Sequence, residues 1–161
     1  MKTIVTMHAL DGERGSVRAE DVYDTDIDDL WQACTTPERL ARWIAEVSGT
    51  PEVGGTVQAS FTSTWTGPIR VESCDPPRHL LLTLEPGTDD ETAVEAWLSE
   101  EGGRTRLVVE ERGLPLKGLH FYGAGWQAHL EDLGRSLAGD ASAWKQRWDE
   151  LTPVYEVMDV G

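Results

Sequence analysis

FYGAGWQAHLEDLGRSLA, residues 121–138, is the stretch that decides the fold. Its large apolar side chains recur every three or four residues, which places them on one face of an α-helix. They are Tyr122, Trp126, Leu130, Leu133 and Leu137. Gln127, Glu131 and Arg135 fall on the opposite face. The pattern predicts one long helix with a buried side and a side exposed to water.

Upstream of this helix the apolar residues change to a period of two, which is typical of strands. Five candidate strands follow in series, separated by short turns rich in Gly, Pro and Asp. They are residues 56–62, 69–74, 79–84, 92–98 and 105–112. Connections this short cannot hold crossover helices, so the strands are predicted to form an antiparallel meander. Residues 2–9 and 16–23 are two earlier strand candidates that are expected to pair with each other.

Two short helices are predicted between the early strands and the meander. Thr25 and Asp28 have the spacing of a capping box at the start of the first helix. Thr36 followed by Pro37 marks the start of the second, because proline is well tolerated in a first helical turn. Trp31 and Trp43 lie on the apolar sides of these helices and are interpreted as core residues.

The predicted meander has one apolar face that another element must cover. The face consists of Val57, Ala59, Phe61, Leu80, Leu82, Leu84, Val94, Ala96, Leu107 and Val109. Only the helix at 121–138 is long enough to cover it. Because a strongly bent sheet cannot touch a straight helix along its whole length, we expect a cavity between the two.

A chain of 161 residues suits one domain, which we assign to residues 1–139, followed by an extension at 140–161. In the extension Trp144, Trp148 and Leu151 have helical spacing, and Pro153 is expected to force an extended path after them. The extension is expected to pack on its own domain or on a partner subunit. Both a monomer and a homodimer therefore remain open.

The charge of the chain excludes some partners. Asp and Glu number 29 against 14 Lys and Arg, which gives a formal net charge of −15. This charge repels nucleic acid and anionic membranes, so neither is an expected partner. No apolar run approaches the roughly 20 residues of a membrane span, and the N-terminus lacks a signal-peptide core. A cytoplasmic location is therefore expected, with Cys34 and Cys74 as buried free thiols.

Motifs for several kinds of enzyme are missing from the sequence. It contains no P-loop, GxSxG or HExxH motif and no Cys/His ligand cluster. We therefore expect no cofactor and no metal.

The string DIDDLWQACTTPERLARW, residues 26–43, resembles the opening of the START-like (SRPBCC) helix-grip superfamily. The resemblance is to the branch related to the activator of the heat-shock-protein ATPase. That branch has an aliphatic–Trp pair, a Thr-x-Pro segment and then Leu-x-x-Trp. The same order appears here as Leu30-Trp31, residues 35–37, and Leu40 with Trp43. Later motifs at 53–55, 74–78, 105–107 and 125–126 extend the resemblance over residues 16–139.

The resemblance implies an α+β helix-grip fold. In this fold a curved antiparallel sheet of about six to seven strands wraps around a long C-terminal helix, with two short helices between the first strands. It also implies a deep pocket that binds a hydrophobic or aromatic small molecule. Members of the superfamily include lipid carriers, plant hormone receptors, aromatic polyketide cyclases and drug-sequestering resistance proteins.

Two other functions stay open. One is a polyketide cyclase or dehydratase-like enzyme with His129, Tyr122 or Glu111 as general acid or base. The other is a protein-interaction module of the chaperone-ATPase-activator kind. Such activators rely on an additional N-terminal domain, for which this sequence has no counterpart of sufficient length.

The candidate ligand-binding residues are the polar and aromatic side chains around the helix and the inward positions of the strands. They are Trp126, Tyr122, His129, Phe61, Trp65, Leu82, Val94, Trp97, Val109 and Gly123. Either Val94 or Trp97 faces the cavity, since the two alternate along one strand. His129 is either a structural histidine or a ligand-contacting one.

Two further hypotheses concern the rim and the interior of the cavity. Gly118, Gly123 and Gly125 weaken the first turns of the helix and indicate either a frayed loop or a gate. An inward Glu111 or Glu95 beside Arg70 is expected to form a buried ion pair.

Overall fold

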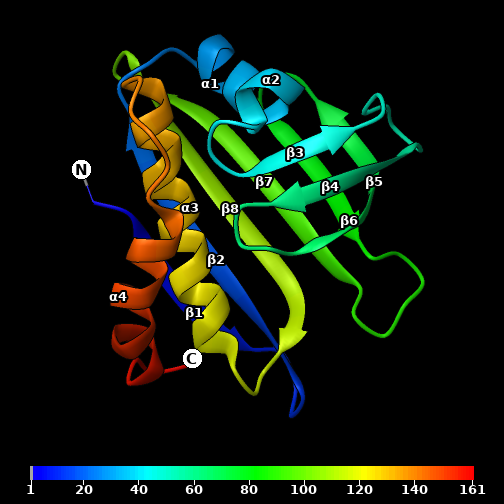
Figure 1. Ribbon diagram of the computed structural model, residues 1–161, viewed down its shortest axis with the longest axis vertical. Helices are drawn as coiled ribbons and strands as arrows, with labels where there is room; N and C mark the ends of the chain where they lie inside the picture. The colour runs from blue at the N-terminus through cyan, green and yellow to red at the C-terminus, as the bar shows by residue number, and fades with distance from the viewer. Residues whose placement is uncertain (1) are drawn as a thin grey trace.

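An antiparallel sheet curves around the long helix α3 in the computed structural model, which describes residues 2–161 (Figure 1). Its eight strands lie in the order β1-β2-β8-β7-β6-β5-β4-β3. Their bounds are β1 Ile4–Ala9, β2 Arg14–Tyr23, β3 Ala45–Ser48, β4 Thr56–Phe61, β5 Thr66–Asp75, β6 His79–Leu84, β7 Thr92–Glu101 and β8 Arg104–Pro115. All neighbouring pairs are antiparallel, and β4 to β8 follow one another as the predicted meander. The α+β class and the helix covering a curved sheet are confirmed.

The sheet has one strand more than the sequence predicts. Residues Ala45–Ser48 form β3, which pairs with β4 at the edge of the sheet. This strand begins directly after Trp43 and Ile44, which are buried residues of the segment that follows α2. Four residues are too few to show a period of two, so the sequence does not predict this strand.

The two short helices are α1, Ile27–Thr35, and α2, Pro37–Leu40. The capping box predicted at Thr25 is wrong, because Asp26 caps α1 by accepting a hydrogen bond from the backbone N–H of Asp29 at 2.8 Å. Thr36 and Pro37 do start α2. Trp43 is buried and its Nε1 donates to the carbonyl of Ala33 at 2.9 Å, which ties the segment after α2 to α1.

The long helix α3 spans Leu119–Leu137, and α4, Trp144–Glu156, lies alongside it (Figure 1). The face of α3 that was expected to be exposed is instead covered by α4. Gln127 is buried and accepts a hydrogen bond from the hydroxyl of Tyr155 at 2.5 Å. Glu131 accepts from Nε of Arg147 at 2.6 Å. Because α4 supplies polar partners to this face, its polar residues do not indicate exposure.

The start of α4 is anchored on α3 by a buried carboxylate. Asp132 is 1% exposed, accepts from the backbone N–H of Ala143 at 2.9 Å and from the hydroxyl of Ser142, and forms an ion pair with Arg135. The helix then continues through Pro153, so the extended path predicted there is wrong. Pro153 lies on the exposed side of α4, where solvent can satisfy the carbonyl that loses its helical partner.

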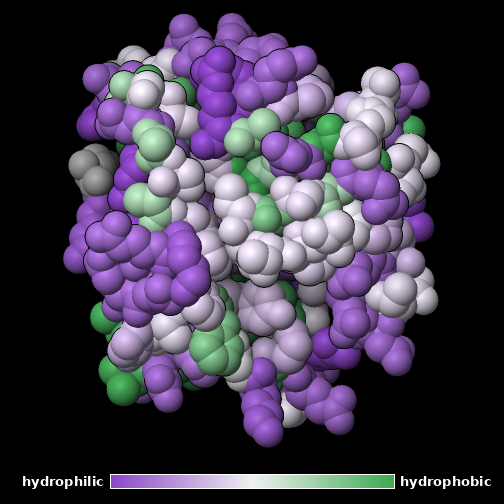
Figure 2. Space-filling view, viewed as in Figure 1, coloured by the Kyte–Doolittle hydropathy of each residue, from purple (hydrophilic) through white to green (hydrophobic). Residues whose placement is uncertain are grey.

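The core lies between the concave face of the sheet and the helices. All ten predicted inward residues of the meander belong to this core or pack against it. Phe61, Leu80, Leu82 and Ala96 among them are only partly buried, which indicates that the helices do not cover them completely. Hydrophilic residues cover much of the face shown in Figure 2, and apolar residues show both in its hollows and at its lower left edge. Within residues 2–161 no helix has the length and apolar character that a membrane span requires.

Candidate functional site

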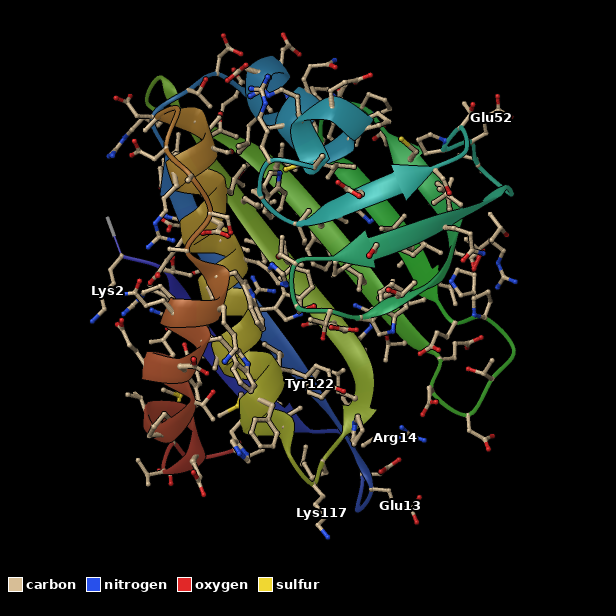
Figure 3. All side chains as sticks on the ribbon, viewed as in Figure 1. Lys2, Glu13, Arg14, Glu52, Lys117 and Tyr122 are labelled. Carbon is tan, nitrogen blue, oxygen red and sulfur yellow. The ribbon has the colours of Figure 1, made fainter. Side chains whose placement is uncertain are left out.

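A cavity of about 530 Å³ opens between the N-terminal half of α3, the turn after β4 and the end of β8. Figure 3 shows Tyr122 and Arg14, two of its lining residues, at the same end of the molecule. We call it the aromatic cavity, because eight of its lining residues carry aromatic rings. These are Phe61, Trp65, Phe121, Tyr122, Trp126, His129, Trp144 and Trp148.

A second cavity of about 430 Å³ lies between the short helices and the sheet, and we call it the aliphatic cavity. It contains Leu82, Val94 and Val109 of the predicted site, together with Cys34 and Cys74. Both cysteines are free thiols, but Cys74 is exposed, so its predicted burial is wrong. Phe61, Leu84 and Trp126 line both cavities and therefore form the boundary between them.

Glu111 is the buried carboxyl of the aromatic cavity. It is 7% exposed, and its Oε1 accepts from Nε1 of Trp126 at 2.9 Å while its Oε2 accepts from the hydroxyl of Thr92 at 2.7 Å. Burial raises its pKa, and the two hydrogen bonds offset only part of that rise. The predicted ion pair with Arg70 is wrong, because Arg70 binds Glu72 at 2.8 Å and Glu95 binds Arg112 at 3.0 Å.

His129 is the buried imidazole of the same cavity and is 4% exposed. Burial lowers its pKa to about 3, although a hydrogen bond to the backbone of Trp43 acts in the opposite direction. The ring is therefore neutral at pH 7. Its Nδ1 is buried and has no hydrogen-bond partner among residues 2–161.

We expect the buried Glu111 carboxyl to make stability depend on pH in a characteristic direction. A carboxyl whose pKa is raised in the folded protein stabilises it below the unfolded pKa, and this stabilisation is lost as pH rises through the folded pKa. The variant Glu111→Gln should therefore gain free energy of unfolding relative to wild type as pH rises from about 4 to 8. Urea unfolding at several pH values measures this difference.

The matched control is Glu131→Gln, which should show the opposite trend. Burial alone would raise the pKa of Glu131, but hydrogen bonds from Arg147 and Gln127 and the charges of Arg147 and Arg135 lower it. The stabilisation by Glu131 is present above its unfolded pKa and is lost as pH falls through its folded pKa. The free energy of unfolding of wild type should therefore exceed that of Glu131→Gln most at neutral pH. A constant difference between Glu111→Gln and wild type from pH 4 to 8 would show that the Glu111 carboxyl is not desolvated.

Two predicted lining residues lie outside both cavities. Trp97 is on the outer face of β7, where its ring centroid is 6.0 Å from that of His79. Val94 faces inward instead, which resolves the alternative left open by the sequence. Gly123 faces β1 and α4, because a Cβ there would lie 3.0 Å from Sδ of Met7 and 2.9 Å from Cδ1 of Tyr155.

The structure adds cavity residues that the sequence analysis missed. Trp144 and Trp148 reach the aromatic cavity from α4, with their rings stacked at 5.6 Å between centroids. Nε1 of Trp144 donates to the carbonyl of Gly125 at 3.1 Å, and Nε1 of Trp148 donates to that of Phe121 at 2.9 Å. In the sequence, the helical spacing of the two tryptophans predicts a helix but does not identify the element against which that helix packs. These two hydrogen bonds attach α4 to the first turns of α3, which contain the glycines. That these turns form a gate over the cavity stays a prediction.

Metal binding has no support from the arrangement of side chains. Across residues 2–161 no three or more His, Cys, Asp or Glu side chains are grouped so that they could hold a metal ion.

Comparison with known proteins places this architecture in a family. Residues 24–138 match the family described as activator of Hsp90 ATPase homolog 1-like protein. The chain belongs to this family. The resemblance to the SRPBCC helix-grip superfamily is thereby confirmed. No curated protein matches the chain significantly.

Solved structures of similar proteins share the fold of this Hsp90-activator-like chain. CalU16 from Micromonospora echinospora is 27% identical with a TM-score of 0.76, and the alignment covers 97% of each chain. DynU16, a protein in the dynemicin biosynthetic locus, is 26% identical with a TM-score of 0.72 over 79% of this chain and 49% of its own. The BPP1335 protein of Bordetella parapertussis is 26% identical with a TM-score of 0.72, and the alignment covers 91% of this chain and 87% of that protein.

Proposed function

We propose that this protein binds a hydrophobic, aromatic small molecule in the aromatic cavity, between the sheet and α3, in the cytoplasm. The observation that carries the proposal is a ring-lined cavity of about 530 Å³ that contains three buried polar side chains, Thr92, Glu111 and His129. This volume lies within the ~300–1,000 Å³ typical of small-molecule sites, which are mostly apolar with a few polar groups.

The shape of the site favours binding of flat, apolar groups. Trp126 separates the two cavities, and its Nε1 is held by Glu111, so its ring has a fixed orientation. Phe61 and Trp65 meet edge to face at 5.0 Å between centroids on the opposite wall. A ligand ring can therefore stack or pack edge-on against rigid aromatic surfaces, which costs little conformational entropy.

The location of DynU16 in a biosynthetic locus is consistent with binding of a biosynthetic small molecule by a protein of this fold. A monomer is part of the proposal, because Trp144, Leu151 and Tyr155 of α4 are buried within a single chain.

The experiment is a titration that follows quenching of tryptophan fluorescence with a panel of aromatic, lipid and polyketide-like compounds. We expect saturable binding of aromatic compounds by the wild-type protein. The variant Leu84→Trp should lose it, because Leu84 lines both cavities and a larger side chain there fills the space between them.

The matched control is Leu81→Trp, which makes the same substitution three residues earlier on the outer face of β6. It adds one tryptophan, as the test variant does, and should bind like wild type. Circular dichroism and thermal unfolding verify that both variants are folded. Equal binding by the two variants, or no aromatic compound binding below about 1 mM, would contradict the proposal.

Acid–base catalysis on a bound aromatic compound is the second candidate, favoured by the buried Glu111 with its raised pKa. His129 is neutral at pH 7 and can only accept a proton there, while Tyr122 is 41% exposed at the rim. This candidate predicts that the wild-type protein cyclises or dehydrates a polyketide-like substrate. It also predicts that Glu111→Gln loses this activity but still binds the substrate. Turnover unaffected by that substitution would reject Glu111 as the catalytic group.

A further inference from the structure

The aliphatic cavity differs in chemistry from the aromatic cavity beside it. Most of its lining residues are Ala, Val, Leu or Ile. Within the part of the chain that the structure describes, no Asp, Glu, Lys, Arg or His side chain lines it, whereas Arg14, Glu85 and Glu111 line the aromatic cavity. An apolar space of this kind holds water poorly and binds apolar groups. The aliphatic cavity therefore suits a saturated carbon chain, and polar groups are better placed in the aromatic cavity.

Several inward-facing side chains of the sheet are left without full cover in the aliphatic cavity. Leu80, Leu82 and Ala96 pack against the core but are only partly buried. Native cores are packed about as densely as organic crystals, with few voids larger than a water molecule. A space of about 430 Å³ is much larger than such a void. An apolar group bound there would complete the core over these side chains.

The two cavities share one floor, which is the concave face of the sheet. On β7, Thr92 lines the aromatic cavity and Val94 lines the aliphatic cavity. On β8, Glu111 and Val109 are divided in the same way. Alternate residues of a strand point to the same face and are about 7 Å apart. Because Val94 is also paired with Glu111 across the two strands, the two cavities adjoin directly.

Three side chains form the boundary between the cavities, and they come from three different elements. They are Phe61 of β4, Leu84 of β6 and Trp126 of α3. Nε1 of Trp126 is bound to Glu111 at 2.9 Å, which fixes the indole. Phe61 and Leu84 have no polar atoms that could hold them in the same way, so a change of rotamer can admit a narrow alkyl chain.

We propose that the ligand is one elongated molecule, an aromatic compound that carries an alkyl chain. Its ring system occupies the aromatic cavity together with any polar substituents, and its chain passes between Phe61 and Leu84 into the aliphatic cavity. The inference rests on the proposed function and names the class of ligand. It also gives the aliphatic cavity a role in binding.

The test is a series of probes with increasing chain length, measured by isothermal titration calorimetry. The probes are 2-naphthol, 6-ethyl-2-naphthol and 6-butyl-2-naphthol. Burial of each methylene group strengthens binding about fourfold, whereas a chain that stays in water contributes nothing. Wild type should therefore bind the butyl probe roughly 15-fold more tightly than the ethyl probe.

The variant Ala96→Phe tests where the chain binds, because Ala96 lines the aliphatic cavity and not the aromatic one. It should bind 2-naphthol as wild type does and lose the gain that the butyl chain gives. The matched control is Ala93→Phe, three residues earlier on β7. Ala93 lies on the outer face of the sheet, paired with Thr83 and Arg112, so this variant should keep the gain. Circular dichroism and thermal unfolding verify that both variants are folded.

A second readout uses the wild-type protein alone, in case Ala96→Phe does not fold. In protein with ¹³C-labelled methyl groups, the terminal methyl group of the butyl probe should show nuclear Overhauser effects to the methyl groups of Leu82 and Val94, which line the aliphatic cavity. The ring protons of the probe should show them to the indole of Trp126.

The outcomes separate this inference from the proposed function. If the three naphthols bind wild type with equal affinity, or if Ala96→Phe keeps the full gain, the inference is overturned while the aromatic cavity still binds rings. If the butyl chain adds nothing but 1-hexanol binds to protein already saturated with 2-naphthol, the cavities hold two separate ligands, which also overturns it. If no naphthol binds at all, the proposed function is rejected and the inference with it.

Discussion

Replacing Trp144 with alanine is expected to lower the free energy of unfolding by about 3–5 kcal/mol, the usual cost of removing a buried tryptophan. Trp144 is 7% exposed, packs against His129 and donates a hydrogen bond to the carbonyl of Gly125. Because it lines the aromatic cavity, its removal enlarges a space that already exists, and neighbouring side chains cannot close it. Urea unfolding followed by circular dichroism measures the loss.

The control for this substitution is Trp97→Ala. Trp97 lies on the outer face of β7 and is only partly buried, so its removal leaves no internal space and should cost much less. Equal losses in the two variants would mean that α4 does not pack on α3 through Trp144.

Adding a single methyl group to α3 at Gly123 should destabilise the protein by about 1–3 kcal/mol. An alanine inside a helix normally stabilises it by up to ~1 kcal/mol relative to glycine, so the expected sign is reversed here. The reversal comes from space, because the new Cβ would lie 2.9 Å from the ring of Tyr155 and 3.0 Å from Sδ of Met7. Tyr155 cannot move away freely, since its hydroxyl is bound to Gln127.

Gly134→Ala is the matched control on the same helix. The nearest atom to a Cβ at Gly134 is Cε1 of Tyr23 at 3.8 Å, which is an ordinary contact. This variant should be as stable as wild type or more stable by up to ~1 kcal/mol. Thermal unfolding of the two variants side by side gives the comparison. If Gly123→Ala is also stabilising, the close approach of α3 to α4 and β1 is incorrect.

The sequence predicts the fold well where a period extends over many residues. The alternation in the meander assigns Val57 and Val109 to the inner face, and the spacing from Trp126 to Leu137 identifies α3 within two residues at each end. It fails where the signal is short or ambiguous. β3 has four residues, and Pro153 is compatible with a helix when it lies on an exposed face.

The candidate site is predictable only in part, because a single sequence shows which side of an element is apolar but not which other element covers it. Trp126, His129 and Phe61 were found because they lie on the inner sides of α3 and β4. Gln127 was misjudged because burial beneath α4 is compatible with a polar side chain that has a partner. Trp144 and Trp148 reach the cavity from a helix whose packing partner no local pattern reveals.

The pairing of polar groups was the least predictable feature. The sequence places carboxylates and arginines on alternating strands, and the register decides which of them meet. Arg70 lies next to Glu72 along its own strand, and that contact leaves Glu111 with Trp126 and Thr92 as partners. The same three-dimensional detail leaves Nδ1 of His129 buried without a hydrogen-bond partner among residues 2–161.

A crystal structure of the protein with 2-naphthol bound tests the central claim most directly. We expect electron density for the naphthalene ring between α3 and the sheet, in contact with Trp126 and Phe61. Density for the probe only on the outer surface, with the side chains of Phe61 and Trp126 filling the aromatic cavity, would contradict it.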